Sequence, residues 1–354
     1  MTDDRDLPAT PRRTFLAGAA GVAALGTAAT AGASDHHERK RETPKTTDDG
    51  DLTGHDLTMD DGYRLRVWER TASDDPEEAV IFVHGMTYGA VPMFDPPVAP
   101  DFGWLPFAAG RGQATFAPDM RGYGDSERPP EYDEPPEANT SGLSFEREAR
   151  DILALTRWLR AERNFDRIHY VGLSGGTWRG RAVYTLGDPD YATVTLAGGS
   201  FETLPVGAEP DGPFYLPHTR EEFDAALTGE IPEGEAVDDW LGGDEFTARE
   251  VLDGVWQPIV TSNQRLAEPD TIANPLVLQQ ATYHPKHIDD PTLVIRASGD
   301  ETISREGALN LYDGVGAIED RKRYVELAGG THFVFLERRR QAFFEEVYGF
   351  QQRY

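Results

Sequence analysis

One serine of the chain stands in a setting that favours nucleophilic chemistry. The run Gly172-Leu173-Ser174-Gly175-Gly176 follows a short apolar stretch and precedes residues 177–184, over which we predict a helix. Glycines allow a sharp strand-to-helix turn that larger residues would strain, and such a turn lifts the serine hydroxyl clear of a sheet. A hydroxyl is a weak nucleophile unless a base takes its proton and an acid orients that base. Without such partners the run would be an ordinary glycine turn.

Both partners occur downstream of the serine, each after a predicted strand. Residues 292–297 lead to Asp300, and residues 324–327 lead to His332, which we predict to begin a C-terminal helix over residues 333–350. The chain order Ser, Asp, His is expected when these loops meet at the carboxyl edge of a doubly wound sheet. The spacing therefore predicts a Ser174-Asp300-His332 triad.

Short apolar runs alternate with helical patterns along the body of the chain. Apolar residues at i, i+3 and i+4 spacing over 145–159 predict a helix, and residues 57–59 and 64–70 flank an Asp-Asp-Gly hairpin turn. This alternation predicts an α/β fold with a mostly parallel, doubly wound sheet covered by helices on both faces. Further buried strands are expected at residues 79–83, 114–118, 168–172 and 194–197.

Five short motifs follow one another from about residue 57 to the C-terminus. They are Val83-His84-Gly85-Met86, Asp119-Met120-Arg121-Gly122-Tyr123-Gly124-Asp125-Ser126, the run around Ser174, Gly299-Asp300 and Gly330-Thr331-His332. In these motifs the chain resembles the α/β-hydrolase fold superfamily, and within it the serine hydrolases that carry a lid.

The resemblance implies a role for each residue of the site. Ser174 is the nucleophile, His332 the general base and then acid, and Asp300 the acid that orients it. The backbone N–H groups of Met86 and Gly175 form the oxyanion hole. Many relatives carry a bulkier residue than Gly175, and many carry a proline where this chain has Thr87, but neither departure removes an N–H donor.

The regular alternation stops between residues 201 and 284. This stretch holds 17 acidic and 3 basic residues, with helical patches near 220–228 and 245–256. We interpret it as a largely helical lid inserted between two parts of the hydrolase core, residues 51–200 and 285–354. The Pro-rich loop 129–136 is a second candidate for the rim of the site.

The composition excludes several classes of function. The formal charge of −28 repels phosphate backbones, so we expect no nucleic-acid partner. The absence of cysteine excludes disulfides, thiol catalysis and cysteine-ligated metals. We expect no cofactor. With 4 lysines and 30 arginines, the acidic chain is typical of halophilic, haloarchaeal proteins, although an ordinary acidic secreted protein is the alternative.

The N-terminus has the features of an export signal. Pro11-Arg12-Arg13-Thr14-Phe15-Leu16 opens an uncharged Ala/Gly-rich run that ends in small residues at Ala33. This resembles a twin-arginine signal peptide over residues 1–33, followed by a flexible linker over residues 34–50. The signal implies that the protein passes through the twin-arginine translocase to the cell envelope or the medium, and that it does not stay inserted in the membrane after cleavage. The alternative is that residues 14–33 are retained as a membrane anchor.

These observations lead to one functional prediction and two alternatives. We predict a carboxylesterase-like serine hydrolase that cleaves an ester or amide of a small molecule through an acyl-enzyme. Dehalogenases and epoxide hydrolases of this fold use a carboxylate at the elbow, and Ser174 argues against both. The alternatives are an aminopeptidase similar to proline iminopeptidase, whose substrate amine an acidic lid would hold, and a binding protein without turnover.

Other polar and aromatic residues have simpler interpretations. We expect His84 to support the oxyanion loop, and Asp119, Arg121 and Asp125 to hold a turn together. His284 and His287 are spaced to share a metal, but no cysteine or carboxylate cluster adjoins them. Three aromatic residues either line a substrate cavity or belong to the core: Phe94, Trp104 and Trp178. Asn139-Thr140-Ser141 fits a glycosylation acceptor.

Overall fold

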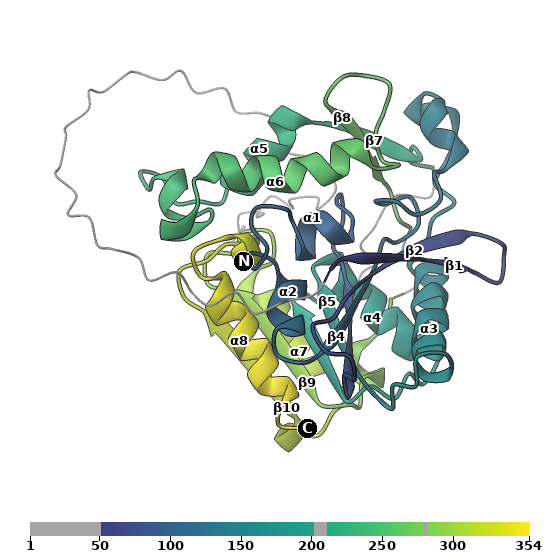
Figure 1. Ribbon diagram of the computed structural model, residues 1–354, viewed down its shortest axis with the longest axis vertical. Coiled ribbons are helices and arrows are strands. Elements are labelled where there is room, and N and C mark those ends of the chain that lie inside the picture. The colour runs from purple at the N-terminus through teal and green to yellow at the C-terminus, as the bar shows by residue number, and fades with distance from the viewer. Residues whose placement is uncertain (1–50, 202–210, 279–281) are drawn as a thin grey trace, which may run out of the picture. The chain divides into compact units, whose positions relative to one another are not determined.

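The computed structural model describes residues 51–201, 211–278 and 282–354 (Figure 1). The predicted signal peptide and linker, residues 1–50, lie outside the described residues. Among the described residues, no helix is both long and apolar enough to cross a membrane.

An eight-stranded sheet forms the centre of the fold and confirms the predicted fold class. The strand order is β1-β2-β4-β3-β5-β6-β9-β10. β1 and β2 form the predicted antiparallel hairpin, β2 pairs antiparallel with β4, and the remaining neighbours are parallel. The strands are β1 Thr53–Thr58, β2 Arg64–Arg70, β3 Glu78–Val83, β4 Ala114–Pro118, β5 Arg167–Leu173, β6 Thr193–Ala197, β9 Thr292–Ala297 and β10 Lys322–Leu327.

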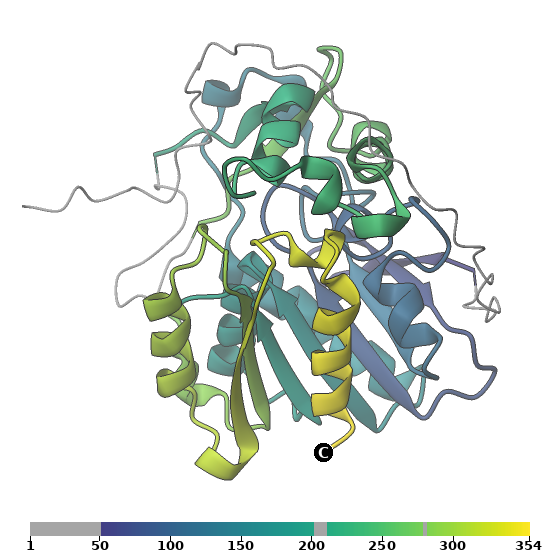
Figure 2. The same cartoon turned by 90° about the vertical axis from the view of Figure 1, so that its left-hand side faces the viewer.

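Side chains of the central strands alternate between two hydrophobic clusters, one on each face of the sheet. In β3, Ile81 and Val83 pack in the cluster that includes α3, α4 and α7, whereas Val80 and Phe82 pack in the cluster that includes α2 and α8. Figure 2 shows the sheet between these helical layers. The helices are α1 Ala90–Phe94, α2 Trp104–Ala109, α3 Phe145–Ala161, α4 Gly175–Leu186, α7 Arg305–Gly314 and α8 Arg340–Gln351.

The three aromatic residues with two possible interpretations belong to the core. Trp104 is 2% exposed and stacks on Phe344, while its edge meets Phe82. Phe94 packs in the same cluster, and Trp178 lies buried in the cluster on the opposite face. Their burial supports the interpretation as core residues.

The predicted C-terminal helix is wrong at its start. A short 3-10 turn, Val334–Leu336, follows His332, and α8 begins only at Arg340. The Glu337 carboxylate folds back to accept hydrogen bonds from the backbone N–H and hydroxyl of Thr331. The Arg338 N–H donates to the carbonyl of Trp240 rather than to a helical partner. Tertiary contacts thus outweigh the helical pattern of the sequence here.

The segment between β6 and β9 contains two helices and a small sheet of its own. We call its described residues 211–278 the insertion. α5 (Arg220–Thr228) and α6 (Ala248–Thr261) both start with a capping box, and β7 (Tyr215–Thr219) pairs antiparallel with β8 (Thr271–Pro275). The two helices lie beyond the carboxyl ends of the parallel strands (Figure 2). The interpretation of residues 201–284 as a lid and the boundaries of the other segments stay predictions.

Candidate active site

Ser174 occupies a strained turn directly after β5. Its φ of 51° and ψ of −113° fall outside the regions that side-chain-bearing residues ordinarily adopt. A Cβ at Gly172 would lie 2.5 Å from the carbonyl oxygen of Gly176, and a Cβ at Gly176 would lie 2.2 Å from that of Val83. Both contacts are with backbone, which cannot move aside. The two glycines are therefore what permits the close approach of α4 to the strands below it.

The His332 ring lies within hydrogen-bonding distance of the other two predicted triad side chains, Ser174 and Asp300. His332 Nε2 is 3.0 Å from Ser174 Oγ, and His332 Nδ1 is 3.0 Å from Asp300 Oδ2. His332 is 8% exposed and Asp300 is 5% exposed. An ionised carboxylate only accepts, so Nδ1–H donates to Asp300 and Nε2 is left to accept the Ser174 proton. This tautomer is the one in which an imidazole acts as a base toward serine.

Carboxylates around His332 favour its charged form. Burial alone would lower the pKa of His332, but the charges of Asp300, Glu230 and Glu337 and the hydrogen bond that His332 donates to Asp300 outweigh it and raise the pKa. The site therefore stabilises the imidazolium that forms when His332 takes a proton.

The loop that carries Asp300 is fixed by its own hydrogen bonds. Asp300 Oδ1 accepts from the N–H of Ile303 at 2.7 Å. The guanidinium of Arg296, on β9, donates to the carbonyl groups of both Asp300 and Ile303. Arg296 is in turn paired with Glu326 on β10, at 2.8 Å. The acid is thus held rigidly at the ends of two neighbouring strands.

Met86 and Gly175, the two predicted oxyanion donors, lie against each other. A Cβ at Gly175 would meet the Met86 side chain at 3.1–3.2 Å, and a Cβ at Gly85 would come within 3.0 Å of the Ser174 Cβ. Among the described residues, neither the Met86 N–H nor the Gly175 N–H donates a hydrogen bond within the protein. Because the Met86 side chain takes the space beside position 175, this site favours glycine where relatives carry a larger residue.

Buried side chains support the oxyanion loop from below. The His84 ring bridges the carbonyl of Gly85 at 2.8 Å and the N–H of Met120 at 2.9 Å, and burial keeps its pKa well below the usual value. His84 is therefore a neutral support, as predicted. The Arg179 guanidinium, on α4, donates to the carbonyl groups of His84 and Gly85 at 2.8 and 3.0 Å.

The charge of Arg179 is balanced by a buried carboxylate. Glu148, on α3, accepts two hydrogen bonds from the guanidinium, and both side chains are fully buried. Although burial alone would lower the pKa of Arg179, Glu148 outweighs it and keeps the guanidinium charged. Nothing in the local sequence pattern around Glu148 or Arg179 marks this pair, so it could not be predicted from the sequence.

A second unpredicted side chain holds the loop after Met86. Thr87 has a φ of 76°, which is a strained value for a β-branched residue, and the N–H of Tyr88 closes a tight turn onto the carbonyl of Met86. Gln264, in the insertion, is fully buried and donates to the carbonyl of Thr87 at 2.8 Å. Its Oε1 accepts from the N–H of Gly124 at 2.9 Å. The insertion thus contributes directly to the shape of the loop that carries Met86 and Thr87.

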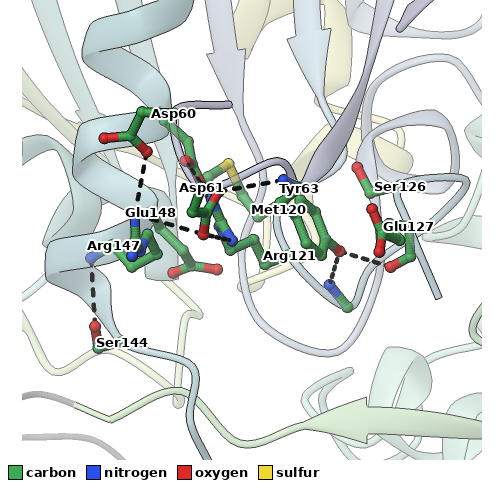
Figure 3. Close-up of polar contacts among 12 residues, drawn as sticks. Asp60, Asp61, Tyr63, Met120, Arg121, Ser126, Glu127, Ser144, Arg147 and Glu148 are labelled. Atoms are coloured by element: carbon green, nitrogen blue, oxygen red, sulfur yellow. Dashed lines mark hydrogen bonds and ion pairs between the residues drawn. The ribbon is translucent and has the colours of Figure 1, made fainter. Parts of the chain in front are cut away.

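Arg121 ties the β1–β2 turn to the core, in agreement with its predicted structural role (Figure 3). It forms ion pairs with Asp61 in the turn and with Asp151 on α3, and it lowers the pKa of Asp61 to about 2. The Tyr63 ring lies 4.3 Å below the guanidinium, and its hydroxyl accepts from the N–H of Gly122. These contacts support the scaffold.

Asp119, another predicted turn residue, and His284, one of the two candidate metal ligands, both make local hydrogen bonds with the backbone. Asp119 accepts hydrogen bonds from the N–H groups of Ala90 and Asp125 and from Trp68, and burial raises its pKa to about 6. His284 Nδ1 accepts from the backbone N–H of Lys286, so it caps a short turn. In the part of the chain that the structure describes, no group of three or more His, Cys, Asp or Glu side chains is arranged to hold a metal ion.

Comparisons with known proteins agree with this architecture. The model of the "Alpha/beta hydrolase family" matches residues 80–346, which is more than half of the chain. One similar solved structure is a serine hydrolase involved in carbazole degradation (CarC enzyme), which is 18% identical with a TM-score of 0.54. The match covers 86% of this chain and 100% of that one. A meta-cleavage product hydrolase (CumD; 18%, 0.54) and the proline iminopeptidase of Mycobacterium smegmatis (13%, 0.52) each cover 85% of this chain and 98% of their own. At these identities the likeness shows the fold alone. No curated protein sequence matches the chain.

Proposed function

The chain belongs to the alpha/beta hydrolase family, and we propose that it is a serine hydrolase that cleaves a carboxylic ester of a small molecule through an acyl-enzyme. The observation that carries this proposal is the continuous hydrogen-bond chain from Ser174 Oγ through the His332 ring to Asp300, with both links at 3.0 Å. The strained backbone of Ser174 supports it, because such strain persists where a function requires it.

Acylation begins when Ser174 attacks the carbonyl carbon of the substrate. The Oγ–carbon bond forms while the serine proton passes to His332 Nε2, and the carbonyl oxygen becomes an oxyanion next to the N–H groups of Met86 and Gly175. Asp300 remains ionised and stabilises the imidazolium. His332 then gives the proton to the leaving alcohol as the carbon–oxygen bond breaks.

Deacylation repeats the same steps with water in place of serine. His332 Nε2 takes a proton from the attacking water, and the hydroxide adds to the acyl carbon of the ester on Ser174. As the second tetrahedral intermediate collapses, His332 returns the proton to Ser174 Oγ. The carboxylic acid leaves and the enzyme regains its starting state, so no cofactor takes part in the cycle.

The test is hydrolysis of nitrophenyl esters of increasing acyl length beside proline and alanine nitroanilides, with Ser174→Ala as the matched control. Ester turnover that disappears in the control supports the proposal, and the chain-length profile measures the acyl pocket. Turnover of the nitroanilides alone would favour the aminopeptidase alternative. A folded protein that turns over none of these substrates and does not react with a serine-directed phosphonate would favour the non-catalytic binding protein.

We further propose that the enzyme acts outside the cytoplasm after export by the twin-arginine pathway, in a salt-rich environment. The paired Arg12 and Arg13 and the acidic, lysine-poor composition motivate this proposal. Replacing both arginines by lysine should retain the protein inside the cells, as detected by immunoblotting of fractions. Unchanged export of that variant would contradict the proposed route.

A further inference from the structure

A carboxylate of the insertion bridges the two loops that carry the acid and the base. Glu230 lies two residues after the end of α5 and is half-buried. Its Oε2 accepts a hydrogen bond from the backbone N–H of His332 at 2.8 Å, and its Oε1 accepts from the hydroxyl of Thr302 at 2.5 Å. Both oxygens are therefore used, and each contacts a different triad loop.

Thr302 belongs to the turn that immobilises Asp300. This turn runs from Asp300 to Ile303, and the side chain of Arg296 binds both of its ends. A hydrogen bond from Thr302 to Glu230 consequently connects Glu230 to the acid through a rigid unit. The bond to His332 connects Glu230 to the base through the peptide group of the histidine itself.

We propose that Glu230 is a positioning residue through which the insertion holds the loops of Asp300 and His332 at their working separation. The proposal rests on the proposed serine-hydrolase function, because it concerns the same triad. Glu230 does not touch the reacting atoms, and its effect on them passes through the two loops.

The charge of Glu230 gives this role a distinctive signature. His332 faces three carboxylates: Asp300 on the β9 loop, Glu337 after β10, and Glu230 from the insertion, and together they raise its pKa against the effect of burial. Removing the charge of Glu230 alone lowers the pKa of His332. His332 must be neutral to accept the serine proton, so such a variant becomes active at lower pH than the wild type.

The chain offers substitutions that separate geometry from charge. In Glu230→Gln, the amide oxygen still accepts from the His332 N–H, and the amide nitrogen can donate to the Thr302 hydroxyl, so both links persist while the charge is lost. Glu230→Ala removes both. Thr302→Val removes one link and keeps the charge. Glu233→Gln, at an exposed position of the same segment, is the matched control for the loss of one negative charge.

The experiment measures the rate at which a fluorophosphonate labels Ser174 between pH 5 and 9, at the lowest salt in which the protein stays folded. In this reaction Oγ bonds to phosphorus, fluoride leaves, and the serine proton passes to His332, so the rate follows the neutral imidazole without needing the natural substrate. Low salt is used because ions screen the charge of Glu230.

In the curve of labelling rate against pH, we expect Glu230→Gln to keep the plateau rate within about twofold of wild type. Its acid limb, where the rate falls because His332 becomes protonated, should move to lower pH. Glu230→Ala should lower the plateau about 10- to 100-fold, as a misplaced catalytic group does. Thr302→Val should lower the plateau less and leave the limb in place, and Glu233→Gln should change neither. A Glu230→Ala variant that keeps the wild-type plateau rate, or an acid limb that does not move in Glu230→Gln, overturns the proposal. A folded wild type that does not label would instead overturn the proposed function.

Discussion

Removal of the Arg179 guanidinium should separate the stability of the fold from the activity of the site. Arg179 forms a fully buried ion pair with Glu148 and donates to the carbonyl groups of His84 and Gly85. Arg179→Met leaves the carboxylate buried without its counter-charge and leaves both carbonyls without this donor. Loss of one partner from a buried ion pair costs about 3–5 kcal/mol.

The expected effect is large enough to measure by thermal unfolding. Since the entropy of unfolding grows with chain length, 1 kcal/mol shifts Tm by only about 1.6 °C for roughly 300 folded residues, and we expect the Tm of Arg179→Met to fall by roughly 5–8 °C. The double variant Arg179→Met/Glu148→Leu also removes the stranded charge. Replacing both partners of such a pair by apolar residues is often close to neutral, so the Tm of the double variant should return to within about 2 °C of wild type.

The activity of the double variant is the decisive readout. Its kcat for a nitrophenyl ester should stay about 10- to 100-fold below wild type, because the carbonyls of His84 and Gly85 still lack the donor that fixes the oxyanion loop. A double variant with wild-type kcat would refute the positioning role of Arg179. A single variant whose Tm stays within about 2 °C of wild type would refute the energetic reasoning about the buried pair.

Three further predictions follow from other buried groups. Gln264→Leu removes the donor to the carbonyl of Thr87, so it should lower the free energy of unfolding by about 2–4 kcal/mol, measured with urea, and should also lower kcat. Unchanged values of both would show that Gln264 does not hold the loop at Thr87. Glu337 has a pKa raised to about 7 by burial, so its contribution to stability is full below pH 4.5 and is lost as the pH rises through 7. Glu337→Gln should therefore be more stable than wild type at pH 8, by up to about 3 kcal/mol in urea unfolding, and equal stability there would contradict the shift. Gly176→Ala would place a Cβ 2.2 Å from the carbonyl oxygen of Val83, so it should yield insoluble protein or a loss of at least about 3 kcal/mol, and a normally folded variant would contradict this packing.

The sequence predicts well those features that depend on local patterns. The apolar run at residues 79–83 corresponds to β3 because a strand covered on both faces needs apolar residues at every position. Ser174, Asp300 and His332 could be predicted because each lies in the loop or turn after a strand, and parallel strands bring their carboxyl ends to one edge. Their catalytic roles stay predictions until they are measured.

Features that depend on tertiary contacts were not predicted. Gln264 lies 177 residues from Thr87, and Glu230 lies 102 residues from His332, so no periodicity links either pair. The start of α8 was wrong for a related reason. The residues after His332 have helical propensity, but the Glu337 side chain satisfies the backbone N–H of Thr331 and delays the helix to Arg340.

The measurement that tests the central claim most directly is the location of a covalent adduct. The protein is treated with a fluorophosphonate, digested, and analysed by mass spectrometry beside the Ser174→Ala variant. If Ser174 is the nucleophile, one adduct per chain forms on the peptide that contains Ser174, and none forms in the variant. An adduct that persists in Ser174→Ala, or a folded wild type that carries none, would contradict the assignment of Ser174 as the nucleophile.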